Sequence, residues 1–243
     1  MSPHILKAKD KTDKFVIDKG ILPQVPFRGL LIGKSGSGKS SMLLNLICNP
    51  DFYMKDFKGE NIYVFTGSPH DVKLMNMCDF KEIPAGNIFH GFQDHIVSEI
   101  YNDMVNEFQQ KMEQGAKSQP EQKLFILDDL FFSNQFRQEN QKDSMLLKLF
   151  QNARKYLGSV LCLAQKASSI ATPIRENASF VITFSASNKQ ADLLEGDYNY
   201  LGSSKDFHRI FKQATKDKHD FLFINMDAPV ERRYMDRDFK FLS

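Results

Sequence analysis

The sequence has few of the features that mark secreted, membrane-spanning or metal-bound proteins. Its three cysteines, Cys48, Cys78 and Cys162, are far apart and form no C-x-x-C pair, so we expect reduced packing residues. The apolar stretches are shorter than about ten residues, too short to cross a bilayer. Residues 1–14 are polar and lysine-rich, and we expect no secretory signal there. Histidines at five positions show no metal-ligand spacing: His70, His90, His95, His208 and His219.

The net charge and the length of the chain exclude fewer classes of protein. The net charge of +2 is nearly balanced, which neither demands nor excludes a nucleic-acid partner. At 243 residues the chain is long enough for one large α/β domain with a sizeable core. The sequence contains no repeat, low-complexity tract or linker that would divide it, so we expect a single domain over residues 1–243.

The strongest motif lies near the N-terminus. An apolar run over residues 30–32 is followed by G-x-x-x-x-G-K-S from Gly33 to Ser40, and a helical pattern begins directly afterwards. Strand, glycine-rich loop and helix in this order form the context of a phosphate-binding loop. Glycines let the loop bring its N–H groups close to a polyphosphate, and the helix N-terminus favours the negative charge. The sequence therefore predicts binding of a nucleoside triphosphate.

The residues of this loop have distinct predicted roles. Lys39 is expected to reach the β- and γ-phosphates, and the Ser40 hydroxyl is expected to coordinate Mg²⁺. ATP and Mg²⁺ are thus the expected cofactors. The predicted nucleotide-binding residues are consecutive: Gly33, Lys34, Ser35, Gly36, Ser37, Gly38, Lys39, Ser40 and Ser41.

A second motif ends an apolar strand. Residues 124–127 are followed by Asp128 and Asp129, which is typical of a Walker B strand in a chain that has a phosphate-binding loop. Asp128 is expected to hold the metal, and Asp129 to act as the base that orients the attacking water. A second acid at this position favours hydrolysis over simple binding. The alternative is that Asp129 caps a helix.

Strand and helix patterns alternate along the rest of the chain, which predicts an α/β fold with a mostly parallel sheet covered by helices on both faces. One helix is expected from Asp94, which would cap it, with Ile96, Ile100, Met104, Phe108 and Met112 on the buried face. Another is expected over residues 143–157, closed by Gly158, with Leu146, Leu147, Phe150 and Leu157 buried. Further strands are predicted at residues 15–17, 62–65, 87–92, 160–164, 180–184 and 221–225. Further helices are predicted at residues 168–177, with a break near Pro173, and at residues 189–195 and 204–214.

The strand at residues 160–164 ends in Gln165. If this strand lies between the phosphate-loop strand and the Walker B strand, Gln165 emerges beside the γ-phosphate as a sensor of hydrolysis. The alternative is a loop glutamine with no role.

Four segments follow in a characteristic order: residues 152–158 (N-A-R-K-Y-L-G), 164–166 (A-Q-K), 174–177 (I-R-E-N) and 180–184 (F-V-I-T-F). This order resembles the FtsK–HerA superfamily of DNA-pumping ATPases. Within it, the chain is most similar to the short DNA-packaging ATPases of large eukaryotic DNA viruses, including the poxvirus type, and of virophages. The resemblance covers roughly residues 27–192.

The resemblance implies a P-loop NTPase fold of the additional-strand, RecA-like type. It implies an ATPase core over residues 27–192, after a flexible arm at residues 1–14 and before a helix and strand extension at residues 193–243. It also implies a homo-oligomeric ring that moves double-stranded DNA into preformed capsids and meets a capsid or portal-vertex protein. The expected location is the host cytoplasm at the assembly site, or the virion.

The resemblance also assigns roles residue by residue. Arg154 matches the arginine just before the fourth core strand and would reach the neighbouring subunit's ATP, with Arg175 as the alternative. The sequence departs from the superfamily in carrying Asp-Asp where Asp-Glu is usual, which leaves the base at Asp129 less certain. The catalytic residues carried over are Lys39, Asp129, Gln165 and Arg154, and the metal residues are Ser40 and Asp128.

Other functions remain open from the sequence. A nucleoside or nucleotide kinase would need an arginine-rich lid, and no such cluster precedes Arg232 and Arg233. A GTPase is disfavoured because Asp192 falls one residue too late for a guanine-reading motif. A scaffold without hydrolysis is disfavoured by the two Walker B acids. DNA contacts, if present, are expected from the polar loops flanking Walker B, with these candidates: Lys117, Lys123, Arg137 and Lys142.

Overall fold

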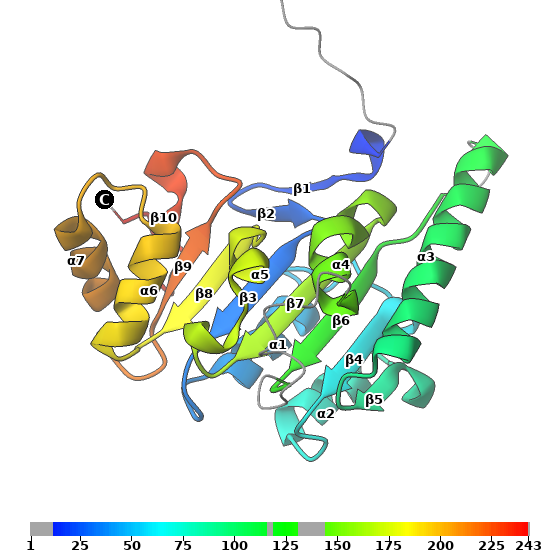
Figure 1. Ribbon diagram of the computed structural model, residues 1–243, viewed down its shortest axis with the longest axis horizontal. Coiled ribbons are helices and arrows are strands. Elements are labelled where there is room, and N and C mark those ends of the chain that lie inside the picture. Colours follow the sequence, from blue (N-terminus) through cyan, green and yellow to red (C-terminus); the bar gives the residue numbers. More distant parts are fainter. Residues whose placement is uncertain (1–11, 116–118, 131–143, 243) are drawn as a thin grey trace, which may run out of the picture.

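The computed structural model describes residues 12–115, 119–130 and 144–242. Within these residues, eight strands form one sheet in the order β10-β9-β8-β3-β7-β6-β4-β5 (Figure 1). Neighbours from β5 to β8 are parallel, whereas β9 and β10 each run antiparallel to the strand before them. The strands of this sheet are β3 (Arg28–Ile32), β4 (Ile62–Thr66), β5 (Ile88–His90), β6 (Lys123–Asp128), β7 (Gly158–Ala164), β8 (Phe180–Phe184), β9 (Phe221–Asn225) and β10 (Tyr234–Met235).

The position of β7 settles the type of sheet. It lies between the phosphate-loop strand β3 and the Walker B strand β6, so the predicted additional-strand arrangement is confirmed. Ile32 is paired with Ala164 across β3 and β7, and Asp128 with Leu163 across β6 and β7. The three strands therefore end at the same edge of the sheet.

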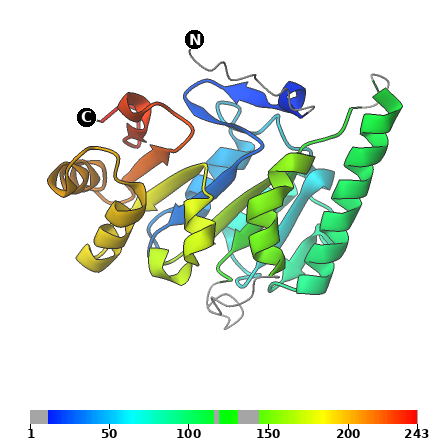
Figure 2. The ribbon, with the colours of Figure 1, turned by 45° about the horizontal axis from the view of Figure 1, so that its top comes forward.

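Helices cover both faces, as predicted (Figures 1 and 2). One apolar core packs the sheet against the helices that lie in front of it in Figure 1, and the other packs it against the two helices behind it. The front helices include α3 (Asp94–Gln114), α4 (Met145–Asn152), α5 (Thr172–Glu176) and α6 (Asn188–Tyr198), and their core also takes in α7 (Ser204–Ala214). Those behind are α1 (Lys39–Cys48) and α2 (Val72–Phe80).

Several predicted boundaries are corrected by the structure. Helix α3 begins at Asp94, but its N-cap is Gln93 and not Asp94. Its buried residues are Val97, Tyr101 and Met104, so the buried face of the helix is rotated from the predicted one. Helix α4 is capped by the Ser144 side chain and ends at Asn152, before a 3₁₀ segment over Ala153–Tyr156. The residue with left-handed backbone after it is Leu157 rather than Gly158, which instead opens β7.

Other differences have equally local causes. The helix expected over residues 168–177 is shortened to α5, which begins at Thr172. The break predicted near Pro173 is confirmed, because Pro173 sits in the first turn of α5, where it needs no N–H partner. The predicted strand at residues 15–17 is a 3₁₀ turn (Asp13–Phe15) followed by a hairpin of β1 (Ile17–Lys19) and β2 (Leu22–Val25). Residues 1–11 of the predicted arm lie outside the described residues. Helix α2 and strand β10 were not predicted.

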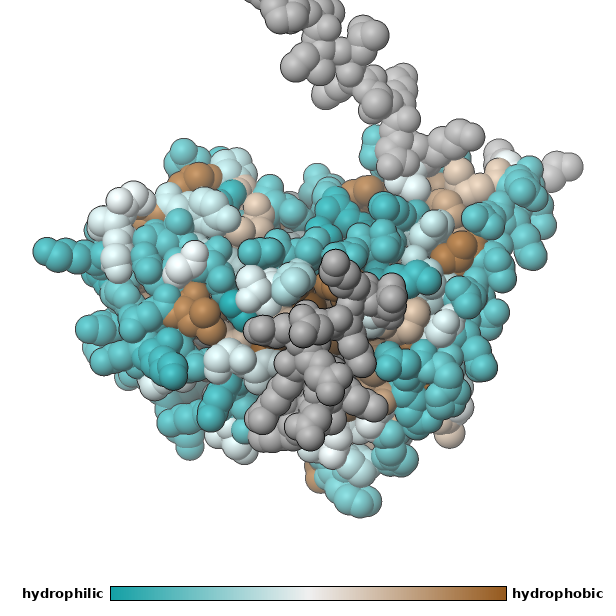
Figure 3. All heavy atoms as spheres, viewed as in Figure 1, coloured by the Kyte–Doolittle hydropathy of each residue, from teal (hydrophilic) through white to brown (hydrophobic). Residues whose placement is uncertain are grey.

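The described surface is largely polar. Figure 3 shows a mostly hydrophilic face with small, separate hydrophobic patches. Within the described residues, no helix has both the length and the apolar character needed to span a bilayer.

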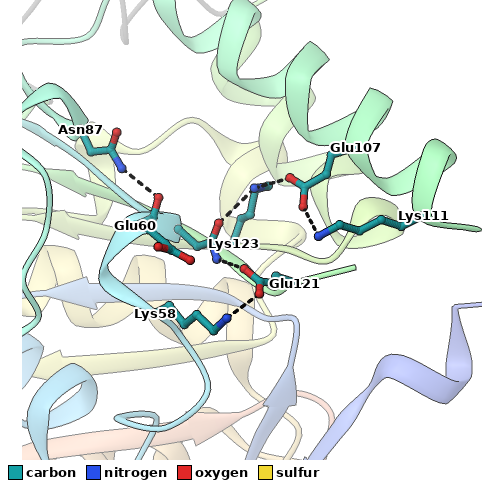
Figure 4. A network of polar contacts seen from close by, with 8 residues as sticks. Lys58, Glu60, Asn87, Glu107, Lys111, Glu121 and Lys123 are labelled. Atoms are coloured by element: carbon teal, nitrogen blue, oxygen red, sulfur yellow. Dashed lines mark hydrogen bonds and ion pairs between the residues drawn. The ribbon is translucent and has the colours of Figure 1, made fainter. Parts of the chain in front are cut away.

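The buried Lys123, the first residue of β6, links α3 to the amino ends of β4 and β6 (Figure 4). The Lys123 ammonium lies 2.6 Å from Glu107 Oε2 on α3 and donates to Asn61 Oδ1 at 3.1 Å. Lys111 donates to the other Glu107 oxygen, at 2.7 Å. Lys123 is only 8% exposed, so it is not available to DNA, and its selection as a DNA contact was wrong. The other three candidates, Lys117, Arg137 and Lys142, lie outside the described residues.

Truncating this lysine should weaken the fold. We expect Lys123→Ala to lower the free energy of unfolding by about 2–3 kcal/mol, because Glu107 and Asn61 each lose a buried charge-assisted partner. Urea unfolding followed by circular dichroism measures this. Lys58→Ala is the matched control, since Lys58 bridges to Glu121 in the same network with an exposed side chain and should leave the midpoint unchanged. Equal midpoints for Lys123→Ala and wild type would contradict the structural role.

Candidate functional site

The glycine-rich segment after β3 folds as a tight loop. The Gly33 N–H donates to Ala164 O on β7 (3.0 Å), and the Ser37 N–H donates to Lys34 O (3.1 Å). Gly36 and Gly38 have left-handed backbone with φ of 73° and 117°, which side chains disfavour. A Cβ on Gly33 would lie 2.5 Å from Ser37 Oγ, so this position also requires glycine. The loop thus has the geometry that its spacing predicted.

A cavity of about 420 Å³ opens beside this loop at the carboxyl ends of β4 and β6. It brings Lys39, Ser40, Asp128, Asp129 and Gln165 together, although these residues come from three distant parts of the sequence. Gly33 and Lys34 instead line an adjacent cavity of about 370 Å³ that shares Gln165. The residues that line the larger cavity are Ser35, Gly36, Gly38, Lys39, Ser40, Ser41, Ser68, Asp71, Val72, Lys73, Asp128, Asp129, Gln165 and His219.

Lys39 lies over the loop that precedes it. Its ammonium donates to Gly33 O at 2.6 Å and to Lys34 O at 3.3 Å. Burial lowers the pKa of Lys39, while nearby aspartates, Asp129 foremost, act in the opposite direction. The ammonium is thus held at the start of α1, where the backbone N–H groups also favour an anion.

Asp128 is a buried carboxylate at the end of β6. Its Oδ2 accepts a hydrogen bond from Thr66 Oγ1 on β4 at 3.0 Å, and its backbone oxygen accepts from the Gly67 N–H at 2.9 Å. Burial is the main cause that raises the pKa of Asp128 to about 6, with Asp129 and Asp71 adding to the rise and Thr66 opposing it. A cation bound nearby would offset this cost, which fits the predicted metal role.

Asp129 is held by two side chains. Gln165 Nε2 donates to its Oδ1 at 3.1 Å, and Ser68 Oγ donates to its Oδ2 at 3.3 Å. Its backbone is left-handed, with φ of 51°, whereas helix N-caps have extended backbone. This conformation argues against the helix-cap alternative. Such strain in a non-glycine residue is found disproportionately at functional sites.

Gln165 thus lies where the strand order predicted. It follows β7, between the phosphate loop and the Walker B strand, and it contacts Asp129 directly. This contact argues against the alternative of a loop glutamine with no role. Its position between Asp129 and the phosphate-binding loop fits the predicted role as a sensor of hydrolysis.

The donor set suits Mg²⁺ bound together with phosphates. Mg²⁺ in such sites takes one or two protein oxygens and completes its shell with phosphate oxygens and water. The cavity offers the Ser40 hydroxyl and the Asp128 carboxylate, while the described residues contain no group of His, Cys, Asp and Glu that could hold a metal by itself. The residues present therefore fit Mg²⁺.

The two candidate arginines differ sharply in their surroundings. Arg175 is 6% exposed, and its guanidinium contacts Asp197 Oδ2 (2.6 Å) and Ile170 O, so it serves the fold around α5 and α6. Arg154 is half-buried in the 3₁₀ segment before β7, at the amino edge of the sheet and therefore opposite the cavity. Burial and the positive charge of Arg154 lower the pKa of nearby Arg28. Arg154 is thus separated from its own subunit's phosphate loop by the length of β7.

The residues of the cavity and its floor that were not singled out from the sequence include Thr66, Ser68, Asp71 and His219. Thr66 is the last residue of β4 and Ser68 follows it, and the two hold the two aspartates, while Asp71 caps α2 and accepts from Ser40. The Nδ1–H of His219 donates to Ser37 O at 2.9 Å. The strand predicted over residues 62–65 could have pointed to Thr66, Ser68 and Asp71. If that strand lies parallel to the Walker B strand, the residues at and after its carboxyl end lie at the same edge of the sheet as Asp128.

Comparisons with known proteins agree with this geometry. A family model described as Poxvirus A32 protein matches residues 14–233. The genome packaging NTPase B204 from Sulfolobus turreted icosahedral virus 2, solved with AMPPCP, is 11% identical with a TM-score of 0.56, over 86% of this chain and 96% of that one. The DNA-packaging ATPase B204 from Sulfolobus turreted icosahedral virus is 12% identical with a TM-score of 0.54, over 87% and 97%. At these identities the likeness establishes the fold. No curated protein matches the chain significantly.

The buried carboxyl of Asp128 predicts a pH-dependent effect on stability. Its pKa is about 6 in the folded protein against an ordinary aspartate value of 3.8, so its charge destabilises the fold increasingly as pH rises from about 4 to 6. Asp128→Asn should therefore stabilise the nucleotide-free protein in EDTA by roughly 2.5 kcal/mol more at pH 8 than at pH 4. Urea unfolding across this range measures the difference. A difference that stays constant with pH would contradict the raised pKa.

Proposed function

This chain belongs to the poxvirus A32 protein family, and we propose on that basis that it is an ATPase that drives packaging of viral double-stranded DNA. The observation that carries the proposal is the convergence of Lys39, Ser40, Asp128, Asp129 and Gln165 on one cavity beside the glycine-rich loop. The fold it shares with solved viral packaging ATPases supports the same conclusion.

The proposed function gives a task to each side chain. Lys39 and the loop N–H groups would bind the β- and γ-phosphates of ATP, and Ser40 and Asp128 would hold Mg²⁺. When bound, Mg²⁺ neutralises charge on the phosphate oxygens. Asp129 accepts the proton of the attacking water, while Gln165 and Ser68 fix its carboxylate in place.

Hydrolysis fits the cavity better than the alternatives. A nucleoside or nucleotide kinase would need an arginine-rich lid, and none of the described residues that line the cavity is an arginine. The segment considered as a guanine-reading motif forms the first turn of α6, which begins at Asn188. A carboxylate held by two donors beside the phosphate loop is arranged for water activation.

Assembly into a homo-oligomeric ring would complete the site. Arg154 lies at the sheet edge opposite the cavity of its own chain, so any ATP that it serves would be that of a neighbouring subunit. Its guanidinium would stabilise charge on the transferring phosphoryl group. We further propose double-stranded DNA as the substrate that the ring moves, a capsid or portal-vertex protein as its docking partner, and the host cytoplasm as its place of action.

Variants of Lys39 and Asp129 separate nucleotide binding from hydrolysis. Lys39→Ala should lose ATP hydrolysis, because the principal cationic ligand of the β- and γ-phosphates is gone. Asp129→Asn should bind ATP but hydrolyse it ~10²–10⁴-fold more slowly, the usual contribution of a general base. Phosphate release and nucleotide binding measure the two effects. Lys55→Ala, which changes an exposed lysine outside the residues that line the cavity, is the control. Undiminished turnover by both Lys39→Ala and Asp129→Asn would overturn the assignment.

The arginine can be tested by mixing variants. Arg154→Ala should bind ATP normally but lose ~10³-fold or more of its turnover, as expected for an arginine supplied in trans. Mixing it with Lys39→Ala should restore some activity, because an intact arginine and an intact phosphate loop then meet at one interface. Lys155→Ala, exposed in the same 3₁₀ segment, is the control. Full activity of Arg154→Ala alone would remove Arg154 from the reaction.

A further inference from the structure

Asp71 joins the phosphate loop to helix α2 through the two oxygens of one carboxylate. Its Oδ1 accepts from the backbone N–H groups of Lys73 (2.8 Å) and Leu74 (3.1 Å), which makes it the N-cap of α2. Its Oδ2 accepts from Ser40 Oγ at 2.8 Å. A helix cap alone needs a single oxygen. The second oxygen is therefore engaged for another reason.

The hydrogen bond fixes the direction of the Ser40 hydroxyl. A serine hydroxyl has one proton to donate and two lone pairs. Because the proton points to Asp71, the lone pairs are directed elsewhere, and a metal can be bound only by a lone pair. The Walker B carboxylate does not provide this acceptor, since the Ser40 hydroxyl donates to Asp71 rather than to Asp128.

We propose that Asp71 is a positioning residue that orients Ser40 toward the Mg²⁺ of bound Mg·ATP and thereby couples the metal to the N-terminus of α2. This inference rests on the proposed ATPase function and adds a residue that the phosphate-loop and Walker B motifs do not contain. A second contact joins the same elements, because Lys73 Nζ of α2 donates to Ser41 Oγ of α1 at 2.5 Å. Both contacts line the nucleotide cavity.

Asp71→Asn separates this role from helix capping. Asparagine caps helices about as well as aspartate, so Oδ1 can still accept from Lys73 and Leu74. Its amide nitrogen is a donor, however, and cannot accept the Ser40 proton. Asp71→Ser is the second variant, because serine also caps but is too short to hold Ser40. Asp79→Asn is the matched control, an exposed acid near the other end of α2.

The experiment measures Mg²⁺ dependence in the absence of hydrolysis. Binding of a fluorescent non-hydrolysable ATP analogue is followed by anisotropy, first in EDTA and then as Mg²⁺ is added. We expect Asp71→Asn and Asp71→Ser to raise the half-saturating Mg²⁺ concentration ~10–100-fold, the usual cost of losing a group that orients a metal ligand. The affinity in EDTA and the urea midpoint should match those of wild type and Asp79→Asn.

Other outcomes overturn the inference in distinguishable ways. If both Asp71 variants require the same Mg²⁺ concentration as wild type, Asp71 is only a helix cap. If they weaken binding equally in EDTA and in Mg²⁺, Asp71 supports the loop rather than the metal. If the wild-type protein binds the analogue no better with Mg²⁺, or not at all, the proposed ATPase function fails as well.

Discussion

The parallel register of four neighbouring strands is the constraint on which the site depends. Thr66 is paired with Asp128, Asp128 with Leu163, and Ala164 with Ile32, so β4, β6, β7 and β3 end at one level. Thr66, Asp128, Gln165 and the phosphate-binding loop therefore lie at the same edge. Because side chains alternate along a strand, a register slip by one residue would turn Asp128 to the opposite face. The buried apolar side chains of β6 and β7 fix that register.

The site places charge where the fold would otherwise avoid it. Burial raises the pKa of Asp128 and lowers that of Lys39, so each group is held in surroundings that disfavour its charge. Hydrogen bonds from Thr66, Ser68 and Gln165 fix the acids without neutralising them. A bound polyphosphate and its cation would supply the missing charges. The charged site thus lowers the stability of the empty protein, and the bound ligand would offset this cost.

The two arginines show how position in the fold separates residues that look alike in sequence. Arg154 and Arg175 each lie in a short helical segment shortly before a core strand. Arg175 is enclosed between α5 and α6 by Asp197 and by backbone carbonyls, whereas Arg154 stays near Arg28 at the amino edge of the sheet. The packing of α6 distinguishes the arginine that serves the fold from the one proposed to act on a neighbouring subunit's ATP.

The sequence by itself determined the phosphate-binding loop, the Walker B acids and the alternation of strands and helices, because these depend on local spacing and on apolar periodicity. It also indicated Gln165, but only on the condition that β7 lies between β3 and β6. The tertiary structure decided that condition, the burial of Lys123, and the entry of Ser68 and Asp71 into the cavity. Those features depend on contacts between segments far apart in the chain, such as the one between Ser40 and Asp71. Local patterns cannot encode them, since strand order and packing fix which ends meet.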